Sequence, residues 1–183
     1  MEGIVVEQGK SRTGTPYVIR YPKDGDAESV WRYANRLSKE RTFVRFQGED
    51  ISLEDETEVV QRWIRHAAEK KAITLLLVVQ NEVQGICGAD RKDKTESHVA
   101  SLALSIDQSL RGQGLGEIFM RAVLSESERM MEGLKIFKLT YKAPNVPAKA
   151  LYEKIGFKTF GVLPRGTQHQ GEYVDEVFMY KEI

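Results

Sequence analysis

The sequence has little cysteine and no long hydrophobic run. Cys87 is the only cysteine among 183 residues. No intramolecular disulfide can therefore form, and a reducing compartment fits best. The longest apolar run, Leu75–Val79, is far shorter than the roughly 20 residues that a helix needs to cross a bilayer. The first ten residues carry no basic flank before a long apolar core. We therefore expect a cytoplasmic protein without a signal peptide.

An excess of either charge is also lacking. Lys and Arg number 27, and Asp and Glu number 27, so the net charge favours neither nucleic acid nor an anionic membrane as a partner. Cys87 lies in the largely apolar segment 83–89, which indicates a buried small side chain rather than a catalytic thiol. The length predicts one domain over residues 1–183, with residues 1–16 forming an additional strand and loop. No metal cofactor is expected.

The hydrophobic pattern predicts an α+β domain around a mixed sheet. Asp24 or Asp26 is expected to cap a first helix, and Ser52 with Asp55 forms the capping box of a second. The continuous apolar run 73–80 is typical of a strand buried on both faces, and a hairpin turn follows it. The elements are expected in the order 3–8 and 16–21 (strands), 26–39 and 52–67 (helices), 73–80, 82–90 and 98–106 (strands), 118–130 (helix), 134–142 (strand), 144–155 (helix), 157–163 and 171–183 (strands).

A glycine-rich segment, RGQGLG at residues 111–116, follows the predicted strand 98–106. Its glycines let consecutive backbone N–H groups face one point and let a phosphate approach without meeting a Cβ atom. The helix that begins there directs its positive end to the same point, and Arg111 adds a charge. These features predict a diphosphate site. A plain tight turn at a helix start is the alternative. A P-loop is excluded because Gly-Lys-Ser/Thr is absent.

A second motif distinguishes between these interpretations. Residues 145–157, NVPAKALYEKIGF, resemble the N-x-x-A-x-x-L-Y-x-x-x-G-F segment of the GNAT acetyltransferases, and residues 111–116 resemble their R/Q-x-x-G-x-G/A pyrophosphate loop. The resemblance is specific over about 99–160. It implies a GNAT fold, in which helices flank a mixed sheet with a splayed cofactor cleft. The implied activity is acetyl transfer from acetyl-CoA to a primary amine of a small molecule, an amino acid, a polyamine or a peptide N-terminus. A non-catalytic acyl-CoA-binding module on the same fold is the alternative, and a homodimer is implied by the relatives.

The resemblance also implies roles for individual residues. The backbone N–H of Ile106 is placed near the thioester oxygen, where negative charge develops. Tyr152 is expected to protonate the departing thiolate, although a phenol with a pKa of about 10 donates uphill by about 1.5 units to a thiolate of about 8.5. Packing against pantetheine is the alternative for Tyr152, and capping of a helix is the alternative for Asn145. The implied cofactor-binding residues are Leu104, Ser105, Ile106, Arg111, Gly112, Gln113, Gly114, Leu115, Gly116, Asn145 and Tyr152.

A general base is harder to place. The glutamate of protein-alanine acetylating relatives corresponds to Thr140, which cannot serve as a base. The glutamate of histone-acetylating relatives corresponds to His98, whose ordinary pKa near 6.5 suits proton removal. We therefore assign His98 as the base, with a surface histidine as the alternative. His66 and His169 are interpreted as ordinary surface residues.

Acidic residues are expected to line the amine site. Glu49 and Asp50 lie between the first two predicted helices, a loop that lines the amine site in many members of the family. Asp175 and Glu176 lie on the last predicted strand and point to opposite faces, so at most one of them can face the site. We assign Glu49, Asp50 and Asp175 to substrate binding.

Overall fold

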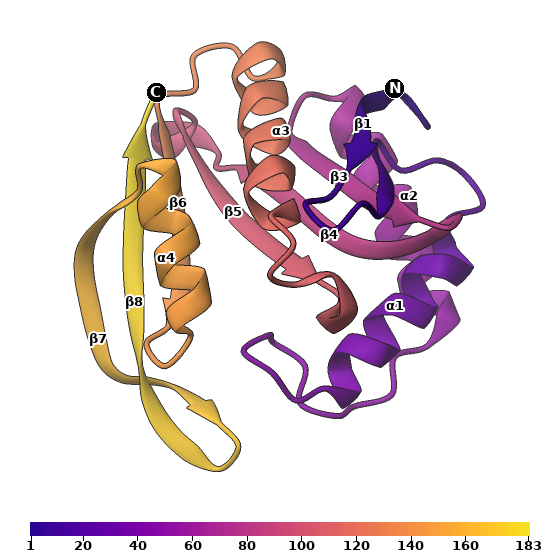
Figure 1. Cartoon of the computed structure of the whole chain (residues 1–183). Coiled ribbons are helices and arrows are strands. Elements are labelled where there is room, and N and C mark those ends of the chain that lie inside the picture. Colours follow the sequence, from indigo (N-terminus) through magenta and orange to yellow (C-terminus); the bar gives the residue numbers. More distant parts are fainter.

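The computed structural model describes residues 1–183 as one eight-stranded sheet with α-helices on both faces (Figure 1). The strand order is β1-β2-β3-β4-β5-β6-β8-β7. Only β5 and β6 pair in parallel, which confirms the expected mixed α+β sheet. None of the helices is both long and apolar enough to cross a membrane. The elements are β1 (Val5–Lys10), β2 (Pro16–Arg20), α1 (Ala27–Lys39), α2 (Leu53–Ala68), β3 (Ala72–Val79), β4 (Glu82–Arg91), β5 (Val99–Ile106), α3 (Leu115–Met130), β6 (Ile136–Lys142), α4 (Val146–Ile155), β7 (Lys158–His169) and β8 (Glu172–Glu182).

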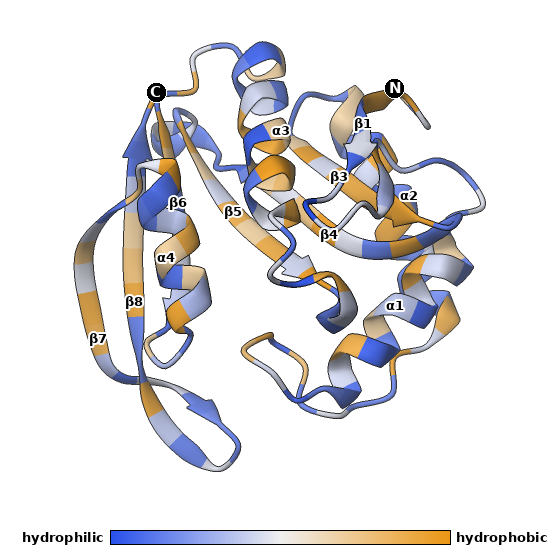
Figure 2. Ribbon diagram, in the orientation of Figure 1, coloured by the Kyte–Doolittle hydropathy of each residue, from blue (hydrophilic) through white to orange (hydrophobic).

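Strand β3 is buried on both faces, as its continuous apolar run predicts (Figure 2). Side chains alternate across a strand, so β3 contributes to two cores. Ile73 and Leu75 join the larger cluster, which includes residues of α3 and α4. Leu76 joins a smaller cluster with Val30 of α1 and Val60 of α2. Helices α1 and α2 therefore cover one face of the sheet, and α3 and α4 cover the other.

Several local signals place the element boundaries. The Ser52 hydroxyl accepts a hydrogen bond from the Asp55 N–H at 3.0 Å, which confirms the predicted cap of α2. Gln80 and Asn81 both have positive φ and form the two-residue turn between β3 and β4. Asp26 stands at the N-cap of α1, but its carboxylate does not cap the helix. It pairs instead with the Arg20 guanidinium through two contacts of 2.7 Å.

Strands β5 and β6 separate soon after they begin. Their pairing covers only the three residues from Val99 to Ser101. Beyond these positions β5 runs on beside β4, while β6 pairs with β8 (Figure 1). The sheet therefore opens between the ends of β5 and β6, as the resemblance implies. The β7–β8 hairpin is longer than predicted, because β7 continues past Leu163 to His169.

Candidate active site

The end of β5 offers an unpaired strand edge at the opening in the sheet. Asp107 donates its N–H to the Gln84 carbonyl of β4 at 2.8 Å. In an antiparallel pair, main-chain groups point alternately toward the partner strand and away from it. The N–H and C=O groups of Leu104 and Ile106 therefore point away from β4, to the side from which β6 has diverged. An extended chain with amide groups can bind to such an edge as an added strand.

The glycine-rich loop joins this strand edge to the N-terminus of α3. Gly112 and Gly114 have φ values of 75° and 83°, a left-handed conformation that glycine adopts without a steric cost. Gly116 lies against α4, since a Cβ atom added there would be 3.3 Å from Leu151. The loop therefore exposes backbone N–H groups at the positive end of a 16-residue helix, which is a suitable site for an anion.

Arg111 has a structural role beside the loop. Its Nε donates to the Ile106 carbonyl at 2.9 Å, and its guanidinium forms an ion pair with Glu40. The sequence predicts that the positive charge of Arg111 binds a diphosphate. In the structure the Glu40 carboxylate compensates that charge. Arg111 thus connects the end of β5 to the chain just after α1.

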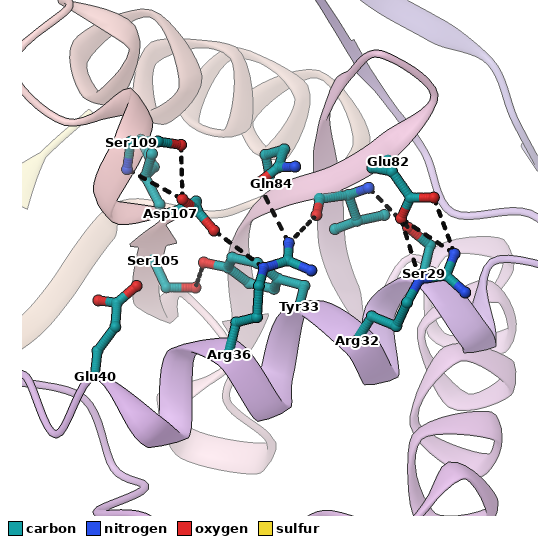
Figure 3. A network of polar contacts seen from close by, with 12 residues as sticks. Ser29, Arg32, Tyr33, Arg36, Glu40, Glu82, Gln84, Ser105, Asp107 and Ser109 are labelled. Carbon is teal, nitrogen blue, oxygen red and sulfur yellow. Dashed lines mark hydrogen bonds and ion pairs between the residues drawn. The ribbon is translucent and has the colours of Figure 1, made fainter.

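A polar network fixes α1 against the end of β5 (Figure 3). The Tyr33 hydroxyl donates to the Ser105 hydroxyl at 2.9 Å, so the Ser105 side chain faces α1 rather than the cleft. Arg36 pairs with Asp107 at 3.3 Å, and Asp107 in turn accepts the Ser109 N–H at 3.0 Å. These contacts hold the glycine-rich loop in a fixed position relative to the strand edge.

Tyr152 lies on α4 and is buried beside β6. Its ring packs edge-to-face against Tyr141 of β6 and Phe157, with centroid distances of 5.9 and 6.2 Å. Burial, the nearby Cys87 thiol and Tyr141 together raise the pKa of Tyr152 to about 12. The hydroxyl is therefore a permanent proton donor at neutral pH. Asn145 accepts the Ala148 N–H at 3.3 Å, so its capping role is confirmed.

A pocket of about 330 Å³ opens where three segments meet. One is the loop after α1, the second is the end of β6, and the third is the β7–β8 hairpin. Thr140, which the resemblance aligns with a glutamate, is among its lining residues. The volume is at the lower end of the range for small-molecule sites, which runs from about 300 to 1,000 Å³. The lining residues are Phe43, Val44, Arg45, Thr140, Tyr141, Lys142, Thr167, Gln168 and Glu176.

The pocket carries charges of both signs. Arg45 and Lys142 supply two cations, and Glu176 supplies one carboxylate. Lys142 donates to the Val44 carbonyl at 3.2 Å, and burial lowers its pKa. His169 is not itself a lining residue, but its ring packs at a tilt of 36° on Phe43 with a centroid distance of 4.6 Å, and its Nδ1 is buried without a hydrogen-bond partner. Burial and the neighbouring Lys142 lower the pKa of His169.

Four of the predicted catalytic and substrate residues lie away from this pocket. His98 is exposed and precedes the first residue of β5, whereas the cleft is at the far end, about 25 Å along the strand. Asp50 pairs with Lys39 at 3.7 Å, and Glu49 accepts the Gln47 N–H within its own loop. Asp175 accepts the Arg165 N–H at 2.9 Å and is not among the lining residues.

The structure therefore places these four residues outside the pocket. Side chains alternate on β8, and Glu176 rather than Asp175 lines the pocket. The loop after α1 does reach the site, but through Phe43, Val44 and Arg45 instead of its acidic residues. His169 is not an ordinary surface residue, since its ring packs on Phe43 and its Nδ1 is enclosed.

The loop, the strand edge and Tyr152 all lie within a segment that matches a known family. The sequence profile described as the Acetyltransferase (GNAT) family matches residues 32–157. The chain belongs to this family. It is an acetyl-CoA-dependent N-acetyltransferase, as the two motifs predict. The matched residues exclude the β1–β2 hairpin and the whole of the β7–β8 hairpin.

Individual relatives agree with this membership. The L-amino acid N-acetyltransferase AaaT of Escherichia coli (strain K12) is 27% identical over 119 residues, which cover 64% of this chain and 73% of that protein. A GNAT-family acetyltransferase from Streptococcus pneumoniae superposes with a TM-score of 0.82 at 25% identity, over 91% of this chain and 99% of that one. The ribosomal L7/L12 α-N-protein acetyltransferase RimL, solved with coenzyme A, has the same fold, with a TM-score of 0.80 at 16% identity and 98% coverage of both chains.

Proposed function

We propose that the acceptor is the amine of a small molecule that also carries a carboxylate, most simply a free L-amino acid. The observation that carries this proposal is the pocket of about 330 Å³ beside Tyr141, with Lys142, Arg45 and Glu176 in its lining. The ammonium group of a zwitterion can pair with Glu176, and its carboxylate can pair with Arg45 and Lys142. A polyamine carries only positive charge, and it would meet two cations in the same small space.

The likeness to a relative supports the same acceptor class. The curated protein that is 27% identical to this chain acetylates L-amino acids, according to its name. The loop and the strand edge supply the other half of the site. We propose that residues 111–116 bind the diphosphate of acetyl-CoA and that the main-chain groups of Leu104 pair with the amides of its pantetheine arm, because the Ile106 carbonyl already accepts the Arg111 Nε.

The proposed chemistry follows from this placement. The neutral amine attacks the thioester carbon, and the Ile106 N–H stabilises the negative charge that develops on the carbonyl oxygen. The C–S bond then breaks, and the sulfur takes a hydrogen bond or a proton from the Tyr152 hydroxyl. His169 packs on the pocket residue Phe43, and it replaces His98 as the group proposed to accept the proton of the amine.

A comparison of amino acids with their α-amides tests the proposed acceptor. The amides keep the amine and lose the carboxylate, so we expect a KM about tenfold or more above that of the acids, the scale of a lost hydrogen bond to a charged group. Lys142→Met should raise the KM for amino acids by a similar factor and leave the amides unaffected. Lys138→Met is the matched control, because Lys138 lies on the same face of β6 four residues earlier and outside the pocket. Equal KM values for acids and amides would refute the assignment.

A further inference from the structure

The turn between β1 and β2 docks on the glycine-rich loop, although about 100 residues separate them in sequence. The carbonyl oxygen of the Gln113 side chain accepts hydroxyl groups from Ser11 at 2.9 Å and from Thr13 at 2.5 Å. The backbone carbonyl of Gln113 accepts the Arg12 N–H at 3.2 Å. Gln113 thus fixes the turn to the loop through both its side chain and its main chain.

The turn is ordered by its own hydrogen bonds as well. Ser11 donates its N–H to the Thr15 carbonyl at 2.9 Å, and the Gly14 N–H donates to the Ser11 carbonyl at 2.9 Å. The Ser11 hydroxyl also accepts the Thr15 N–H at 3.1 Å. The backbone that carries Arg12 is therefore held in place before any ligand binds.

Arg12 lies directly beside the left-handed glycine that begins α3. A Cβ atom added to Gly114 would be only 2.8 Å from the Arg12 Nε. Arg12 is exposed and takes part in none of the ion pairs of the molecule, whereas Arg111 on the same loop is paired with Glu40. A cation beside the positive end of a helix is unfavourable unless an anion lies between them.

From this geometry we infer that Arg12 is a cofactor-binding residue, which contacts the diphosphate of acyl-CoA from the β1–β2 turn. The inference rests on the proposed role of residues 111–116 as the diphosphate site. The backbone N–H groups of the loop bind one side of the diphosphate, and the Arg12 guanidinium binds another through charge-assisted hydrogen bonds. Arg111 is neutralised by its ion pair with Glu40, so Arg12 supplies the positive charge for the diphosphate in its place. The turn lies outside residues 32–157, the part that the family profile matches.

Calorimetry with coenzyme A tests the role of Arg12. We expect Arg12→Ala to weaken binding by about 10- to 100-fold, the scale of lost hydrogen bonds to a charged group. Lys10→Ala is the matched control, because it removes one exposed cation from the same hairpin away from Gly114, and its affinity should stay near that of the wild type. The same loss should occur with 3′-dephospho-CoA, which keeps the diphosphate, and should vanish with pantetheine, which has no phosphate.

Two results would overturn the inference. One is wild-type affinity of Arg12→Ala for coenzyme A. The other is a loss that disappears with 3′-dephospho-CoA, because Arg12 would then contact the 3′-phosphate. Failure of the wild-type protein to bind coenzyme A would instead overturn the role of residues 111–116 themselves. Thermal unfolding of each variant without ligand shows whether it is folded, and exposed Arg12 and Lys10 are expected to leave the melting temperature unchanged.

Discussion

Replacing Tyr152 by Phe removes one hydroxyl group from the cleft and keeps the ring that packs on Tyr141 and Phe157. In the structure the pKa of Tyr152 is higher than that of a free phenol, so proton transfer from its hydroxyl is less favourable. With the pKa of Tyr152 at about 12, full proton transfer to a thiolate of about 8.5 is uphill by about 3.5 units, or about 5 kcal/mol. A hydrogen bond to a charged group contributes about 1.5–3 kcal/mol. We therefore expect the hydroxyl to act mainly by hydrogen bonding to the sulfur as the C–S bond breaks.

This value sets the size of the expected effect. Loss of about 1.5–3 kcal/mol from the transition state lowers the rate of acetyl transfer by about 10- to 150-fold, with little change in acetyl-CoA affinity. The raised pKa also keeps the hydroxyl protonated throughout neutral and mildly alkaline pH. The wild-type rate should consequently show no decline between pH 7 and pH 10 that is due to Tyr152.

The assay is a single-turnover measurement with acetyl-CoA bound in advance, because slow product release can hide a chemical defect in steady state. Tyr180→Phe is the control, since Tyr180 lies on β8, packs against Phe160 and does not line the pocket. Calorimetry with coenzyme A shows whether Tyr152→Phe retains its affinity. A wild-type single-turnover rate in Tyr152→Phe would refute the reasoning and leave the ring with a packing role only.

Three further predictions concern the loop, the base and the cysteine. Gly112→Ala and Gly114→Ala should each cost about 1–2 kcal/mol of unfolding free energy for their positive φ. Calorimetry should show the larger loss of coenzyme A affinity in Gly114→Ala, because only that Cβ atom displaces Arg12. His169→Asn should lower kcat/KM more at pH 7 than at pH 9, where more of the amine is already neutral, and parallel pH profiles would exclude His169. Cys87 is fully buried, and burial raises the pKa of its thiol, so alkylation followed by mass spectrometry should label it only after unfolding.

The cofactor half of the site could be predicted from the sequence because its signals are local. A glycine-rich loop before a helix and the segment 145–157 each depend on residues that are close in the chain. The structure confirms the Asn145 cap and the opening between β5 and β6, and it adds that Gly112 and Gly114 have positive φ. The binding of acetyl-CoA by these residues stays a proposal.

The pocket proposed to bind the amine could not be predicted, because it is assembled from segments that are distant in the sequence. The ring of Phe43 meets His169 across more than 120 positions of the sequence, and no local pattern records that contact. The hydrophobic pattern predicts an end of β7 at residue 163, because residues 164–169, PRGTQH, show no alternation of apolar side chains. His169 therefore falls outside the predicted strand. The pairing of Arg111 with Glu40 is equally non-local. The sequence therefore could not show that Arg12, rather than Arg111, is the arginine without an ion pair beside the loop.

The central claim is that this chain transfers acetyl groups to small amines that carry a carboxylate. The most direct measurement is thiol release from acetyl-CoA by the wild-type protein with L-amino acids, their α-amides, a polyamine and short peptides, with the acetylated products identified by mass spectrometry. The account predicts acceptor-dependent turnover that is highest with free L-amino acids. Acetyl-CoA binding without turnover on any amino acid, or a higher kcat/KM for the polyamine or the peptides, would contradict it.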